Sequence, residues 1–147
     1  MSRLFVYYSN SGNGDYVASI MREKGFNTLK IELEHELPQS FFFKIIVGGF
    51  KSMIKEKPKI KNDLTILKNY NEIYVGTPIW NKRVSAPINT VLESLKTTNF
   101  NLICYSGSGN IKKIVKEVKD YKIENIISLI EPLKNKEDTI KILNKYI

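Results

Sequence analysis

The chain has 147 residues, a length typical of one domain, and 42% of them are hydrophobic, which excludes a disordered or low-complexity protein. Lys and Arg outnumber Asp and Glu by 23 to 15, giving a formal net charge of +8. One cysteine, Cys104, excludes an internal disulfide, and one histidine, His35, excludes a histidine metal cage. The sequence has neither an apolar run long enough to span a membrane nor a secretory leader pattern, so we expect a cytoplasmic protein without membrane insertion.

The positive charge is mostly lysine, since only Arg3, Arg22 and Arg83 are arginines. Nucleic-acid binders usually rely on arginine for bidentate contacts, so we expect no nucleic acid partner. The densest basic stretch runs from Lys51 to Lys61 and is either a solvated surface or a docking patch.

The first half of the chain begins with a strand over residues 3–8, where apolar and aromatic residues run continuously. A small polar loop over 9–14 follows, then a helix over 15–24 and a second strand over 28–33. Residues 39–54 keep a helical spacing of apolar side chains, which Gly48 and Gly49 weaken. We expect a helix there and a polar linker over 55–62.

The second half repeats the alternation. We expect strands over 72–77, 100–105 and 123–130, and helices over 86–95, 111–121 and 136–146. Pro78 predicts that residues 77–81 form a loop. The apolar spacing places Val115 and Ile140 on the inner faces of their helices.

Five strands alternating with helices predict parallel pairing, because each connection is long enough for a crossover. The expected fold is therefore a single α/β domain over residues 1–147, a doubly wound five-stranded parallel sheet of order 2-1-3-4-5 flanked by helices in a three-layer sandwich. In such sheets ligands bind beyond the carboxyl ends of the strands. The first, third and fourth strands end in polar or glycine-containing loops, which this order brings together.

The first loop favours a phosphate cradle, because glycines let the backbone approach a ligand and short hydroxyls add donors at a helix N-terminus. Its residues are Ser9, Asn10, Ser11, Gly12, Asn13 and Gly14. A plain helix-capping turn is the alternative. The P-loop pattern lacks its lysine here, and the dinucleotide fingerprint fails at Val17, although Glu32 lies at a suitable distance for a ribose contact.

The other two loops favour contacts with a planar ligand. Trp80 lies beside a proline at the predicted ligand edge, where stacking competes with core packing as its role. Residues 106–109 are small enough to touch a ligand edge, or they form a capping turn. Cys104 stands where a nucleophile elbow needs glycine, so we expect no catalytic serine there, and Cys104 itself reads as an inert core thiol.

Three segments together resemble the flavodoxins: residues 6–14, residues 74–80 continued by 86–88, and residues 106–109. The resemblance implies that the first loop, Ser9 to Gly14, holds the phosphate of FMN. It implies that the isoalloxazine ring is lined by Thr77, Pro78, Ile79, Trp80 and Asn81, and that its pyrimidine edge meets Ser106, Gly107, Ser108 and Gly109. Two departures are Gly14, where the family usually has threonine, and the basic net charge.

The function that the resemblance implies is that of an FMN-binding electron carrier, which shuttles single electrons between redox partner proteins. Because the chain is basic, we expect acidic docking surfaces on those partners, and we expect a monomer. Neither catalytic nor metal-binding residues are predicted. Two alternatives are an NAD(P)H-dependent FMN or quinone oxidoreductase and a flavodoxin-fold module with weak or lost flavin binding.

Overall fold

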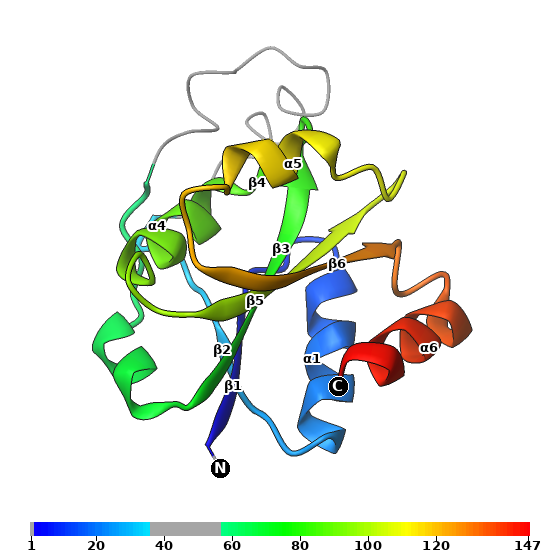
Figure 1. Ribbon diagram of the computed structural model, residues 1–147, viewed down its shortest axis with the longest axis horizontal. Helices are drawn as coiled ribbons and strands as arrows, with labels where there is room; N and C mark the ends of the chain where they lie inside the picture. Colours follow the sequence, from blue (N-terminus) through cyan, green and yellow to red (C-terminus); the bar gives the residue numbers. More distant parts are fainter. Residues whose placement is uncertain (1, 36–56) are drawn as a thin grey trace.

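A computed structural model describes residues 2–35 and 57–147 of the chain. Figure 1 shows a twisted sheet at its centre, with five parallel strands in the order β2-β1-β3-β5-β6. These strands are β1 (Arg3–Tyr7), β2 (Asn27–Lys30), β3 (Glu72–Trp80), β5 (Phe100–Ser106) and β6 (Ile123–Ile130). In chain order this is the predicted sequence 2-1-3-4-5, so the doubly wound parallel fold is confirmed.

Helices cover both faces of the sheet, as Figure 1 shows. One face carries α1 (Asn13–Glu23) and α6 (Lys136–Tyr146), and the other carries α4 (Ala86–Ser94) and α5 (Lys112–Glu117). Alternate residues of β1 enter separate cores: Leu4 and Val6 pack with α4 and α5, whereas Phe5 and Tyr7 pack with α1 and α6. The two-residue period of a strand therefore divides the apolar side chains between two layers.

The predicted elements agree closely at β6 and α6 and less well elsewhere. The strand expected over 28–33 is shorter: parallel pairing with β1 ends after Lys30, where Ile31 N–H still donates to the Tyr7 carbonyl at 2.7 Å. Leu33 then forms an antiparallel bridge with Ile60, flanked by backbone hydrogen bonds to Lys59 and Lys61. A short 3-10 helix, η1 (Leu64–Asn69), was not predicted; Asp63 caps it by accepting the Thr65 N–H at 3.0 Å. The helix expected over 39–54 lies outside the described residues, as do Lys51 and Lys55 of the basic stretch.

Two helical side chains were assigned to the wrong face. Val115 is 49% exposed and Ile140 is 42% exposed, although their spacing predicted burial. The helix α5 has only six residues, so Ile114 and the following Val118 already cover the sheet. On α6, the fully buried Leu143 covers the sheet, and Ile140 remains at the surface.

A sixth strand, β4 (Arg83–Val84), folds back antiparallel on the end of β3. This corrects the prediction of a loop over 77–81, since β3 continues through Pro78 to Trp80. Proline tolerates this position because β-sheet backbone accepts its fixed φ where no ladder donor is needed. The turn between the strands is Asn81 and Lys82, both at positive φ (47° and 63°), the geometry of a tight hairpin turn.

The burial of Cys104 predicts that its thiol is unreactive in the folded protein. Cys104 is fully buried between β3 and β6, and burial raises its pKa from 9.0 to about 12. Since the thiolate is the reactive form, we expect no reaction with Ellman's reagent at mildly alkaline pH in the folded protein and one thiol equivalent after unfolding in guanidinium. Prompt labelling of the folded protein would show that this part of the core opens readily.

Candidate functional site

The carboxyl ends of β1, β3 and β5 border one cavity of about 220 Å³. The parallel register aligns these ends, because Tyr7 pairs with Gly76 and Pro78 pairs with Tyr105. All three chain segments singled out from the sequence contribute to its wall. The lining residues are Asn10, Ser11, Asn13, Pro78, Ile79, Trp80, Tyr105, Ser106, Gly107 and Glu131.

The first loop leads from β1 into α1 through Gly12, whose φ of 91° lies in the left-handed region that favours glycine. Gly12 stands at the N-cap and has no side chain that could cap the helix, but Ser9 supplies a capping bond to the first turn, so the capping turn and the phosphate cradle both remain open. Ser9 Oγ accepts the N–H of Asp15 at 3.3 Å, further inside the helix. The first N–H groups of any helix lie outside its own ladder, which makes this end suited to an anion.

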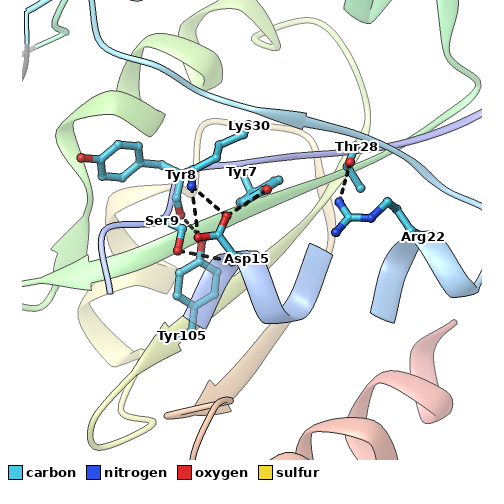
Figure 2. A network of polar contacts seen from close by, with 8 residues as sticks. All are labelled: Tyr7, Tyr8, Ser9, Asp15, Arg22, Thr28, Lys30 and Tyr105. Atoms are coloured by element: carbon cyan, nitrogen blue, oxygen red, sulfur yellow. Dashed lines mark hydrogen bonds and ion pairs between the residues drawn. The ribbon is translucent and has the colours of Figure 1, made fainter. Parts of the chain in front are cut away.

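Figure 2 shows how Asp15 fixes the start of α1 to the sheet. Its carboxylate accepts the Tyr7 hydroxyl at 3.1 Å and forms an ion pair with Lys30 at 2.8 Å. These contacts connect α1 to β1 and to β2. Burial, with the neighbouring Asp15 charge, raises the pKa of Tyr7, so this phenol stays a hydrogen-bond donor at neutral pH.

Trp80 is placed by the β3–β4 hairpin, where it pairs with Arg83. Its indole is only 7% exposed and meets the Tyr8 ring edge to face at 5.7 Å between centroids. The side chain is thus packed by the protein and also lines the cavity. This position is compatible with core packing and with stacking on a ligand, and the stacking role stays a prediction.

Thr77 lies apart from the cavity lining. It is fully buried, and its hydroxyl donates to the Pro78 carbonyl at 2.8 Å and accepts the Ser85 N–H at 3.1 Å. The Ser85 hydroxyl lies 3.0 Å away and is also buried. These contacts tie β3 to the start of α4 and so hold the hairpin that carries Trp80. Asn81 belongs to the turn of this hairpin and is likewise outside the cavity lining.

The segment after β5 is divided between two cavities. Ser106 and Gly107 line the first, whereas Ser108 and Gly109 line a second cavity of about 410 Å³ beside α6. The separation is produced by a tight turn in which Ser106 Oγ accepts the Gly109 N–H at 2.9 Å. A Cβ added to Gly107 would meet nothing within 4 Å, so the space beside it is open.

Two lining residues were not among the predicted site residues. Tyr105 belongs to the strand predicted over 100–105, and no role in the site was assigned to it from the sequence. Glu131 follows β6 at a φ of 37° and pairs with Lys134 at 3.0 Å. Its N–H donates to the Ser106 carbonyl at 2.9 Å, which draws the β6–α6 connection to the cavity. Asn13 continues this contact by accepting the Leu133 N–H at 3.0 Å.

Within residues 2–35 and 57–147, no cluster of histidine, cysteine or carboxylate side chains could hold a metal ion. Over the same ranges, no helix has the length and apolar character needed to cross a membrane.

The fold and the cavity define a doubly wound α/β protein with its candidate site at the switch point of the sheet. The flavodoxin family model matches residues 51–147, more than half of the chain, and the chain therefore belongs to the flavodoxin family. No curated protein sequence gives a significant match.

Solved structures of similar fold cover almost the whole chain. A candidate flavoprotein from Bacteroides eggerthii is 19% identical, with a TM-score of 0.71, and the match covers 97% of this chain and 96% of that one. A flavoprotein in complex with FMN from Lactobacillus acidophilus is 18% identical, with a TM-score of 0.65 and coverages of 92% and 97%. A NADPH-quinone reductase from P. pentosaceus is 9% identical, with a TM-score of 0.57 and coverages of 99% and 95%. At these identities the likeness concerns the fold.

The buried Thr77 hydroxyl yields a stability prediction. We expect Thr77→Val to lower the free energy of unfolding by about 1–3 kcal/mol, because the buried Ser85 N–H loses its acceptor. Urea unfolding measures the change. Thr97→Val, the same substitution at an exposed threonine, is the control and should stay within about 0.5 kcal/mol of the parent protein. Equal effects of the two substitutions would contradict the role assigned to Thr77.

Proposed function

We propose that the chain binds FMN and carries single electrons between redox partner proteins. The observation that carries this proposal is the cavity itself, whose wall joins polar residues of the first loop to Pro78, Ile79 and Trp80. FMN has a phosphate at one end and a flat ring system at the other, so its two ends match these two parts. The flavin supplies the redox chemistry when bound, and the protein supplies binding and orientation.

The first loop suits the phosphate. Residues 8–14 contain neither Lys nor Arg, so the proposed donors are the hydroxyls and amides of Ser9, Asn10, Ser11 and Asn13 with the backbone around Gly12 and Gly14. Glu131 opposes this assignment, since a carboxylate in the cavity wall repels an anion. Its ion pair with Lys134 at 3.0 Å offsets part of that repulsion.

The rest of the cavity suits the ring. Pro78, Ile79 and Trp80 form an apolar wall, and Ser106 and Gly107 bring backbone groups to the open space beside them. Thr77 and Asn81 support this wall through the hairpin. Ser108 and Gly109 lie on the second cavity, and we propose that they shape the turn that presents Gly107. The FMN complex of the Lactobacillus acidophilus flavoprotein supports FMN as the cofactor.

The positive charge supports acidic redox partners. Lys57, Arg83, Lys113 and Lys116 line a hollow of about 590 Å³, together with Glu117. Arg83 pairs with Trp80 across the hairpin, so the hairpin connects this basic hollow to the cavity proposed for the flavin. A positive surface beside the flavin would attract negatively charged partners and steer their approach.

Flavin binding is tested on the purified protein. We expect a yellow protein, or an apoprotein that binds added FMN with a change in its visible spectrum. Ser11→Ala should weaken FMN binding about tenfold by removing a charge-assisted hydrogen bond to the phosphate. Ser19→Ala, on the helix that follows the first loop but outside the cavity lining, should leave FMN binding unchanged.

A colourless protein that does not bind FMN would refute the proposal. The remaining interpretation would then be a flavodoxin-fold module that has lost flavin binding. The reductase alternative, suggested by the name of the P. pentosaceus neighbour, predicts steady-state oxidation of NADPH with a quinone acceptor. We expect no such turnover.

The charge of the docking surface is tested with small acceptors. Oxidation of the reduced protein by hexacyanoferrate(III), an anion, should slow several-fold as ionic strength rises, whereas oxidation by hexaammineruthenium(III), a cation, should accelerate. Lys113→Glu should slow the reaction with the anion, and Lys68→Glu on η1, at a distance from the hollow, should change it little. The same salt dependence for both acceptors would contradict the proposal.

A further inference from the structure

Gly14 occupies a position with no room for a side chain. A Cβ at this residue would lie 2.5 Å from the Tyr105 hydroxyl oxygen, 2.8 Å from Ser9 Cβ and 2.9 Å from the Tyr8 carbonyl oxygen. Gly14 is inside α1, and its φ is not among the positive values, so the backbone itself would accept another residue. Space, rather than conformation, requires the glycine here.

The Tyr105 hydroxyl fills that space and donates a hydrogen bond to the Tyr8 carbonyl. Figure 2 shows the Tyr105 ring reaching from β5 toward the start of the first loop. Tyr105 is 3% exposed, and burial raises its pKa well above 10.0, so the phenol remains a donor at physiological pH. Tyr8 is also held by β3, since its N–H donates to the Gly76 carbonyl at 3.2 Å.

The first loop therefore begins at a residue fixed from two neighbouring strands. Ser9, the next residue, accepts the Asp15 N–H, and the cavity wall begins at Asn10. A shift of the Tyr8 carbonyl would move the donors on both sides of Gly12. Hydrogen bonds to a phosphate depend steeply on distance and angle, so such a shift would weaken them.

We propose that Tyr105 is a positioning residue for the phosphate cradle. Its hydroxyl occupies the space that a side chain at position 14 would need, and it holds the Tyr8 carbonyl in place. A residue of β5, rather than a side chain of α1, therefore stabilises the phosphate cradle. The consequence is selectivity for a phosphorylated flavin over one without a phosphate. This inference rests on the proposed binding of FMN.

The test compares FMN with riboflavin, which has the same ring and ribityl chain but no phosphate. In Tyr105→Phe we expect the dissociation constant of FMN to rise about tenfold, while that of riboflavin stays within about twofold. Both ligands are titrated into the same apoprotein sample, so a partly unfolded fraction affects both constants equally and leaves their ratio unchanged. Tyr74→Phe, a buried tyrosine of the same apolar cluster, is the matched control and should leave the ratio at the wild-type value.

A second variant makes the test independent of the folding of Tyr105→Phe. Gly14→Ala should weaken FMN more than riboflavin, because the added methyl group collides with the Tyr105 hydroxyl and displaces the loop. In the Tyr105→Phe background the same substitution should cost less, since the loop is no longer fixed at Tyr8. The four proteins form a double-mutant cycle that measures this coupling.

The outcomes separate the inference from the proposed function. If the wild-type protein binds neither flavin, the proposed function fails and the inference fails with it. If the wild-type protein binds FMN and Tyr105→Phe weakens both flavins equally, or neither, the positioning role of Tyr105 is overturned and the proposed function stands. A selective loss of FMN binding supports both.

Discussion

The pairing of β3 with both β1 and β5 is the constraint on which the candidate site depends. Val75 pairs with Val6 on one side and with Leu102 on the other, and all three side chains are fully buried. A shift of this register by one residue would exchange the side chains between the two cores. Because the register is fixed in this way, the three strand ends meet at one edge of the sheet and the segments that follow them share a cavity.

The cavity wall is held by polar contacts, buried or partly buried, as well as by apolar packing. Thr77 ties the hairpin to α4, Asp15 ties α1 to the sheet, and Tyr105 ties the first loop to β5. In the described part of the chain, every buried side-chain nitrogen or oxygen has a hydrogen-bond partner. When all the polar groups that support a site have hydrogen-bond partners, the site has few alternative arrangements. This favours a cavity wall that is already formed before the ligand binds.

Much of this arrangement could be predicted from local sequence patterns. A continuous apolar run located β1, apolar-rich segments located β5 and β6, and the alternation with helices predicted the parallel order. The prediction over 77–81 was wrong because a proline usually interrupts a strand, whereas here β3 continues beyond the parallel sheet and pairs with β4. Tyr105 and Glu131 were missed because their places depend on contacts with residues far away in the sequence, such as Tyr8 and Ser106. Val115 and Ile140 show the same limit, since spacing along a helix does not say how much of the sheet remains to be covered.

The first loop and the basic hollow lie in different parts of the molecule, and this separation has a consequence. Residues 8–14 contain no cation, while Lys57, Arg83, Lys113 and Lys116 gather at a different hollow beyond the hairpin. A phosphate bound at the first loop would therefore rely on short-range hydrogen bonds, which salt screens weakly. Docking of an acidic partner would rely on long-range attraction, which salt screens strongly. Ionic strength would thus change the rate of partner association while leaving the cofactor in place, provided that Arg83 steers the partner to the hairpin that also carries Trp80.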